Sequence, residues 1–330
     1  ATGPGSAILG SLLFSALFLS PMSAKFLLRV AGTLLLAWAA AAACVALHTP
    51  LPWMLGPLVA TSVLSMAGAP TESWGPLRNG GQWAIGAALG LYFTPEVSAL
   101  VGSLWWAIVL GIGWALLLGW GFGAWLYRLH APRMHGVPAS MLRSTSYFAG
   151  AIGAASEMTL LSERENARTD LVAASHSLRL LIVTITIPFA LQWSGLQGLD
   201  ILTPTVRDVS WPGLALLALL TGAGALVMDR LGRANPWFMG AMLVSMAVTM
   251  AGLHLSAVPQ AVVNAAQLVI GVSLGVRFRA EFLHTAPRWL ASVAVGTFGL
   301  MGICAAFAAV LAWATGLPWV TLLLGTSPGG

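Results

Sequence analysis

Residues 79–96 read NGGQWAIGAALGLYFTPE, and residues 264–281 read NAAQLVIGVSLGVRFRAE. Eight of the eighteen aligned positions are identical, against roughly two expected by chance in so biased a composition. The identities pair Asn79 with Asn264, Gln82 with Gln267, Ile85 with Ile270, Gly86 with Gly271, Leu89 with Leu274, Gly90 with Gly275, Phe93 with Phe278 and Glu96 with Glu281. The chain therefore contains an internal duplication with an offset of 185 residues.

A second pair of similar segments lies upstream, at an offset of 184. LPWMLGPLVA (51–60) and NPWFMGAMLV (235–244) share Pro52 with Pro236, Trp53 with Trp237 and Gly56 with Gly240. Proline suits a first helical position because its missing N–H needs no partner there, and tryptophan favours the headgroup level of a membrane. We therefore expect a helix to begin at each Pro-Trp pair. The Gly-x-x-x-Gly spacing that follows in both copies is typical of closely packed helix faces.

The composition excludes a soluble globular domain. Of 330 residues, 58% are hydrophobic and 8% are charged, against roughly a quarter charged in ordinary soluble domains. The mean hydropathy is +0.86. At about 30 residues per span and loop, the length allows around ten or eleven membrane crossings. We therefore expect an all-α polytopic membrane protein with about ten transmembrane helices.

The net charge of +5 does not indicate a nucleic-acid partner. The fifteen basic residues occur singly or in pairs and form no basic patch, which binding to nucleic acid would need. Basic residues in short loops between apolar segments instead indicate which loops face the cytoplasm.

Apolar runs bounded by Pro, Gly or charge are the candidate spans. They fall at about 26–47, 53–67, 80–93, 101–127, 171–193, 211–228, 237–253, 262–276, 289–315 and from 318 onward. Residues 138–162 (PASMLRSTSYFAGAIGAASEMTLLS) are different, because they are rich in Gly, Ala and Ser. This segment either crosses the membrane fully or is a re-entrant or broken helix, which is tolerated at membrane depth only when packed in protein or lining a cavity.

The basic residues favour the re-entrant or broken helix. If the segment crosses fully, seven Lys and Arg lie on one face and eight on the other. If it returns to its own side, only Arg207 lies opposite, as the positive-inside rule expects of a cytoplasmic face. The other fourteen are Lys25, Arg29, Arg78, Arg128, Arg133, Arg143, Arg164, Arg168, Arg179, Arg230, Arg233, Arg277, Arg279 and Arg288. In this topology the two copies are inverted, which is an architecture of secondary transporters.

The chain divides into three parts: an extra N-terminal apolar segment (1–24), a first repeat (25–200) and a second repeat (201–330). Residues 7–19 (AILGSLLFSALFL) are short for a span. They are either an extra helix, the hydrophobic part of a signal peptide, or the end of a truncated helix.

These motifs resemble those of the AbrB-type integral membrane family, which carries a membrane AbrB duplication and is labelled as ammonia monooxygenase or regulator of aidB expression. The resemblance covers about residues 25–330. It implies a fold similar to cation/proton antiporters and anion transporters, with inverted repeats and about ten helices. The family's Pro-Gly-Gly-x-x-Glu-Met signature falls on residues 152–158, where Ile152 and Ala154 replace Pro and the second Gly. The second copy ends at Pro328, Gly329 and Gly330, before its Glu-Met, so we expect a truncated second repeat.

Glu157 is the first candidate for a binding site. It alone among the ten acids lies in a run otherwise free of charge, where an unpaired carboxylate costs several kcal/mol. The alternative is a solvated residue, or a helix cap, at a re-entrant tip. Gly153 belongs to the same signature, and Ser144, Thr145, Ser146 and Ser156 are candidate hydrogen-bond donors to the same cavity, although such hydroxyls often bond their own backbone.

Further candidates lie outside this segment. Arg179 and His176, one helical turn apart, form either an anion-binding or proton-relay pair, or Arg179 extends to the cytoplasmic surface. The duplicated polar residues Asn79, Gln82, Asn264 and Gln267 are secondary candidates. Pro328, Gly329 and Gly330 would expose backbone amides to an anion at a helix break.

The leading functional hypothesis is a secondary transporter of a small, anionic organic solute, coupled to protons or Na⁺ through Glu157. We expect it in the bacterial inner (plasma) membrane, with no cofactor, and Gly-rich helix faces permit a homodimer. The alternative is an indirect role in gene regulation. Direct DNA binding is not expected, because the cytoplasmic loops are too short to hold a DNA-binding module. A monooxygenase needs metal ligands, but Cys44, Cys304 and the six scattered histidines form no ligand cluster. These histidines are His48, His130, His135, His176, His254 and His284.

Overall fold

The computed structural model describes residues 23–134, 136–195, 208–278 and 286–328. Every regular element in these ranges is a helix. The predicted all-α class is therefore confirmed for the described part of the chain. The N-terminal segment, Arg207 and the chain end from Gly329 lie outside it.

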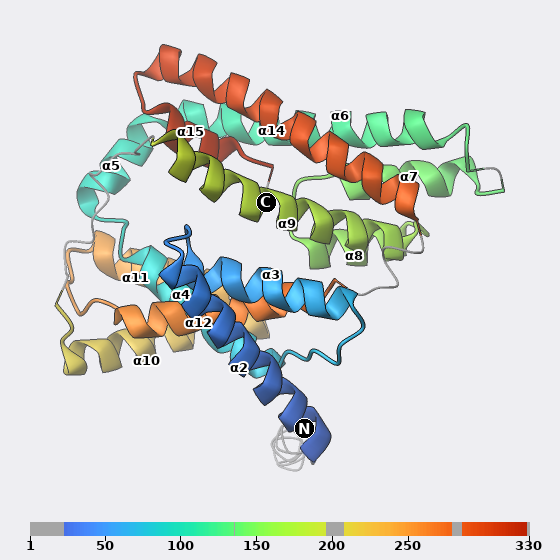
Figure 1. Ribbon diagram of the computed structural model, residues 1–330. Helices are drawn as coiled ribbons and strands as arrows, with labels where there is room; N and C mark the ends of the chain where they lie inside the picture. Colours follow the sequence, from blue (N-terminus) through green and yellow to red (C-terminus); the bar gives the residue numbers. More distant parts are fainter. Residues whose placement is uncertain (1–22, 135, 196–207, 279–285, 329–330) are drawn as a thin grey trace, which may run out of the picture.

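The helices form two layers, which Figure 1 shows one above the other. The lower layer, here the repeat layer, contains helices from both halves of the chain that pack against one another. They are α2 (Ala24–Ala46), α3 (Pro52–Met66), α4 (Gly75–Gly90), α10 (Trp211–Arg230), α11 (Pro236–Met250) and α12 (Gln260–Gly275). The other layer, here the broken-helix layer, contains α6 (Trp105–His130), α7 (Ala139–Gly150), α8 (Ala155–Arg164), α9 (Thr169–Ser194), α14 (Pro287–Thr315) and α15 (Trp319–Thr326). The short helix α5 (Pro95–Ser103) leads from the first layer to the second.

Glycines allow the helices of the repeat layer to approach closely. A Cβ on Gly56 would lie 2.7 Å from the Ala40 carbonyl oxygen, and one on Gly271 would lie 2.6 Å from that of Met54. The contacts recur at positions 184 or 185 apart. In the first pair of contacts, Gly56 packs on Ala40 and its counterpart Gly240 packs on Gly224. In the second pair, Gly86 packs on Phe238 and Gly271 on Met54. In the third, Gly90 packs on Met242 and Gly275 on Leu58. The duplicated glycines are therefore packing positions, because only a small residue lets two backbones come this close.

The Pro-Trp pairs open helices, as predicted. Helix α3 begins at Pro52 and α11 at Pro236. The preceding residues, Leu51 and Asn235, both adopt the left-handed conformation, with φ of 45° and 46°. The two helix starts therefore have the same backbone geometry.

Five described helices are long and apolar enough to cross a membrane, namely α2, α6, α9, α10 and α14. The number rises to six if α4 and α5, which meet at a bend of 82°, count as one span. The apolar helices α3, α11 and α12 have only 15 or 16 residues, whereas a span needs about 20. A multi-pass membrane protein is thus supported, while about ten spans stays a prediction.

The segment 138–162 is broken. Helix α7 ends at Gly150 and α8 begins at Ala155, so residues 151–154 interrupt the helix. The predicted irregularity of this Gly-, Ala- and Ser-rich segment is confirmed. Whether the segment returns to its own side of the membrane stays a prediction.

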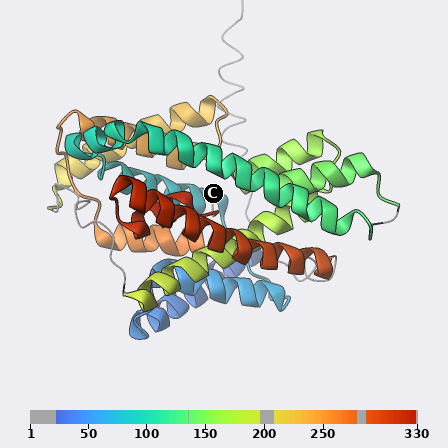
Figure 2. The same ribbon diagram turned by 90° about the horizontal axis from the view of Figure 1, so that it is seen from above.

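Trp289 of α14 lies at the centre of the broken-helix layer and is 2% exposed. Its indole N–H donates to Ser175 Oγ of α9 at 2.8 Å. The long helices of this layer are α6, α9 and α14, which Figure 2 shows from above. Cys304 is fully buried beside this core, whereas Cys44 is half-buried.

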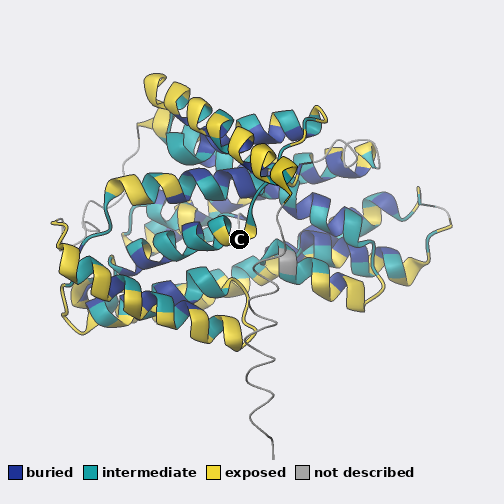
Figure 3. Cartoon of the chain, turned by 90° about the horizontal axis from the view of Figure 1, so that it is seen from below, coloured by how far each residue is buried: buried dark blue, intermediate teal, exposed yellow. Residues whose placement is uncertain are grey.

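The outward faces of the helices are exposed (Figure 3), and they carry many large hydrophobic side chains. Trp313 on α14 is 89% exposed, and Leu219 on α10 is 72% exposed. Exposed apolar area of this extent favours contact with acyl chains over contact with water. The long helices therefore have one side for protein packing and another for lipid.

Candidate functional site

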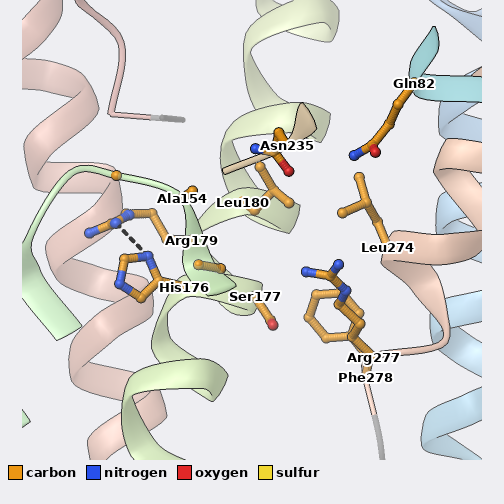
Figure 4. Close-up of a pocket in the computed structure, with 12 residues that line it drawn as sticks. Gln82, Ala154, His176, Ser177, Arg179, Leu180, Asn235, Leu274, Arg277 and Phe278 are labelled. Atoms are coloured by element: carbon orange, nitrogen blue, oxygen red, sulfur yellow. Dashed lines mark hydrogen bonds between the residues drawn. The ribbon is translucent and has the colours of Figure 1, made fainter. Parts of the chain in front are cut away.

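A cavity of about 300 Å³ lies where the broken helix faces the repeat layer. Figure 4 shows its side chains converging from both layers. The broken-helix layer contributes Gly153, Ala154, Ala155, His176, Ser177, Arg179 and Leu180, and the repeat layer contributes Gln82, Asn235, Leu274, Arg277 and Phe278. Four predicted site residues, Gly153, His176, Arg179 and Gln82, are thus brought together.

Arg179 caps the end of α7. Its guanidinium donates to the carbonyl oxygens of Ala149 at 3.3 Å, Gly150 at 3.0 Å and Ala151 at 2.6 Å. The last carbonyls of a helix have no partner within the helix, and in a membrane interior no bulk water can supply one. A buried cation at this end also complements the negative pole of the helix dipole.

His176 completes the cap. Its Nε2 lies 2.8 Å from the Phe148 carbonyl oxygen, and its Nδ1 lies 3.0 Å from Arg179 Nη2. Since the guanidinium can only donate, Nδ1 accepts and Nε2 donates. The contacts therefore select the neutral imidazole with its hydrogen on Nε2.

The structure pairs Arg179 with His176 as the sequence suggested, while an anion-binding or proton-relay role for the pair stays a prediction. Arg179 is only 3% exposed and lies ten residues into α9, about 15 Å from its first residue. Its side chain is therefore directed into the protein and does not extend to an exposed surface. Both of its Nη groups are occupied by backbone carbonyls and His176, so these contacts stabilise the helix break.

The other side of the break presents donors to the cavity. Helix α8 has no side-chain cap at its N-terminus, and the backbone amides of Gly153 and Ala154 donate to no residue that the structure describes. The first amides of a helix carry its positive pole. This edge of the cavity therefore favours an acceptor or an anion.

Arg277 places a second cation at the cavity. It follows the last turn of α12, is exposed, and forms no hydrogen bond or ion pair with the described residues. Arg78 lies close enough to repel its charge. Among the described lining residues none is acidic, and Gln82, Asn235 and Ser177 add neutral polar groups. The electrostatics of the cavity thus favour an anionic ligand.

Glu157 does not line this cavity. It lies half-buried in the first turn of α8, where a carboxylate is favourable near the positive pole of the helix. The ion pairs among the described residues are Arg29 with Glu72 and Arg168 with Asp170. Glu157 is therefore placed as a helix-start acid one turn from the cavity wall.

The other candidates of the broken segment lie elsewhere. Thr145 donates to the Met141 carbonyl at 2.7 Å and accepts from the Arg168 amide at 2.9 Å. Ser146 is buried, and its hydroxyl has no partner among the described residues. Ser144 lines a separate surface cleft with Arg128 and Arg143, and the side chain of Ser156 is not described.

The duplicated polar residues are not equivalent in the structure. Gln82 lines the cavity, whereas its counterpart Gln267 is half-buried away from it. Asn79 accepts from Arg78 at 3.3 Å, and Asn264 accepts from Gln260 at 2.9 Å. Pro328 is buried after α15, and Gly329 and Gly330 lie outside the described residues.

Sequence reasoning did not single out Arg277, Asn235 or Ser177 as binding residues. A signal existed for two of them, because Arg277 stands where the first repeat has Tyr92, and Asn235 stands where it has Leu51. A polar residue at an apolar position of a duplicated segment departs from what packing alone requires. For Ser177 the sequence carries no such signal.

No group of three or more His, Cys, Asp or Glu residues is placed to hold a metal ion in the described part of the chain. His135 and His284 lie outside it.

Comparison with known proteins gives one family. The family model described as "Transition state regulatory protein AbrB" matches residues 53–330. A protein of Escherichia coli (strain K12) named "Putative regulator AbrB" is 26% identical over 290 residues, which cover 86% of this chain and 80% of that protein. No solved structure matches the chain.

Proposed function

Because this chain belongs to the AbrB family of membrane-type proteins, we propose that it is a secondary transporter in the bacterial plasma membrane. Its solute is a small organic anion, which it moves by alternating access. The observation that carries this proposal is the cavity at the helix break, which Arg277 and the start of α8 line and to which no described acid contributes. Broken helices that direct a helix start at an anionic group are typical of secondary transporter sites.

Inverted repeats are the finer part of this proposal. They are supported by the matched contacts of the duplicated glycines, and by the matched left-handed residues before α3 and α11. With about ten spans, such repeats would give an architecture like that of cation/proton antiporters. The two copies would then differ in polarity at Arg277 and Asn235, so that the cavity described here belongs mainly to one of them.

The position of the cavity supports alternating access. Its walls come from two layers that each pack mainly within themselves. A rigid-body shift of one layer against the other would open the cavity to one side of the membrane and then to the other. The side of the membrane to which the cavity opens would change, while its charged side chains would still line it.

Coupling to protons or Na⁺ is assigned to Glu157, which lies in the first turn of α8 beside the cavity wall. We expect Glu157→Gln to lower solute-driven flux in proteoliposomes at least tenfold, or to remove its dependence on pH and Na⁺. The assay uses labelled L-malate and L-lactate as probe solutes. Glu163→Gln is the matched control, because Glu163 is an exposed acid on the same helix. Unchanged flux with an unchanged pH and Na⁺ dependence in Glu157→Gln would contradict this role.

A regulatory role is the second candidate, favoured by the printed descriptions of the family and of its relative. It is compatible with transport if the solute itself acts as the regulatory signal. In that case Arg277→Gln should abolish solute uptake and the transcriptional effect together. A transcriptional effect that survives the loss of uptake would favour regulation without transport.

A further inference from the structure

We infer that the solute is a small carboxylate that carries a hydroxyl or keto group and no ammonium group, and that Arg277 pairs with its carboxylate. This inference rests on the transport function proposed above and names the chemical class of the solute. It follows from which groups in the cavity are free to bind, which are already occupied, and which are absent.

Arg277 is the cation that is free to pair. Arg179 also lines the cavity, but its guanidinium already donates to three carbonyls and to His176. Arg277 has no hydrogen-bond partner among the described residues, and the charge of Arg78 acts on it unfavourably. A carboxylate would relieve this repulsion and would match the planar fork of the guanidinium.

An ammonium group would find no acceptor of the right charge. Among the described lining residues no carboxylate is present, and the carbonyls of Ala149, Gly150 and Ala151 are taken by Arg179. The adjacent edge consists of backbone amides at the positive end of α8. A desolvated ammonium would therefore face like charge without a compensating carboxylate among the described residues, so we expect amino acids to bind more weakly than hydroxy or keto acids.

A neutral oxygen on the solute would be satisfied. The side chains of Gln82 and Asn235 each offer an amide donor and a carbonyl acceptor, and Ser177 offers a hydroxyl. These groups suit a hydroxyl or keto oxygen, which needs a donor, an acceptor or both.

The volume suits a solute of a few carbons. The cavity of about 300 Å³ corresponds to roughly ten water molecules at about 30 Å³ each. Leu180, Leu274 and Phe278 provide an apolar wall for the carbon chain. Hydroxy and keto acids of three or four carbons, with one or two carboxylates, fit this space.

The test measures binding to the purified full chain in lipid nanodiscs by calorimetry. The probes are L-lactate, pyruvate and L-malate, each compared with an analogue of the same size: L-alanine for the first two and L-aspartate for L-malate, with lactamide as the uncharged probe. We expect at least one hydroxy or keto acid to bind and its amino analogue to bind at least tenfold more weakly. Arg277→Gln should weaken this binding at least tenfold. Arg230→Gln, an exposed arginine at the end of α10, should leave it unchanged.

A second variant tests the inference independently if Arg277→Gln does not fold. Asn235→Asp keeps the size of the side chain and the left-handed backbone, which Asp tolerates, and adds a negative charge to the cavity. It should weaken carboxylate binding and narrow the preference over the amino analogue. Binding of no carboxylate probe, equal binding of an amino analogue, or unchanged binding in a folded Arg277→Gln protein would each overturn the inference.

Flux measurements with the same probes separate this inference from the transport function. A hydroxy or keto acid that binds through Arg277 but is never transported would leave the chemical class in place and refute transport. Transport of L-alanine, L-aspartate or lactamide in preference to the acids would keep the transport function and refute the class.

Discussion

Arg179 illustrates how a buried cation acquires a structural role inside a membrane protein. Its partners are the carbonyls of Ala149, Gly150 and Ala151, which α7 leaves unpaired where the helix stops. Without Arg179 these carbonyls would lack partners in a buried environment. Arg179 is therefore a positioning residue for the break, and it acts on the cavity through α7 and α8.

Arg179→Leu should destabilise the protein, because it removes a charged donor from several buried acceptors. The expected loss is on the order of 3 kcal/mol, since each unsatisfied buried group costs about 1–3 kcal/mol. Thermal unfolding in detergent measures this loss, and hydrogen exchange should accelerate in the last turn of α7. The control is Arg164→Leu at the exposed end of α8, which should stay within about 0.5 kcal/mol of the parent. Equal stability of the two variants would contradict the capping role.

At the level of elements, the helices of the repeat layer are held together by backbone contact at glycines. A Cβ on Gly271 of α12 would lie 2.6 Å from the Met54 oxygen of α3. Gly86 of α4 meets α11 at the corresponding position, against Phe238. Both pairs of helices therefore leave no room for a larger side chain at these positions.

Gly271→Ala and Gly86→Ala should each destabilise the protein by about 1–3 kcal/mol, as overpacking does in a close-packed core. Gly299→Ala in α14 is the matched control. Nothing lies within 4 Å of a Cβ at Gly299, so this change should be neutral or stabilising by up to about 1 kcal/mol through helix propensity. Thermal unfolding in detergent measures all three. If Gly271→Ala lowered the stability and Gly86→Ala did not, the two copies would not be packed equivalently.

For the whole molecule, the membrane topology determines which loops face the cytoplasm. The distribution of basic residues predicts that the segment 138–162 returns to the cytoplasmic face. Arg133 and Asn166, which flank α7 and α8, would then lie on the same side, and Thr49 between α2 and α3 would lie opposite.

Single cysteines at positions 133, 166 and 49 test this topology in a background in which Cys44 and Cys304 are replaced by alanine. A membrane-impermeant maleimide should label position 49 in intact spheroplasts, and positions 133 and 166 only after permeabilisation. Labelling of 133 and 166 from opposite sides would mean that the broken helix crosses fully. The inverted arrangement of the repeats would then lose its topological support.

The sequence alone was sufficient for the multi-pass membrane class, the helix starts at Pro52 and Pro236, and the irregularity of 138–162. These properties are local, because hydropathy, a proline at a first helical position and the composition of one segment act over a turn or a span. They do not depend on which helices later pack together. The identical residues 184 or 185 positions apart were also visible, because counting them needs no structure.

The composition of the cavity was decided only by the tertiary structure. Arg179 meets carbonyls 28 to 30 residues earlier in the chain, and Gln82 and Arg277 meet α9 from two different parts of the repeat layer. Glu157, the acid that the sequence pointed to most directly, lies beside this cavity and does not line it. Which side chains share a cavity depends on the packing of whole helix faces against one another. That packing is a long-range property, because it brings together residues far apart in the chain, as at Arg179 and Arg277 around this cavity.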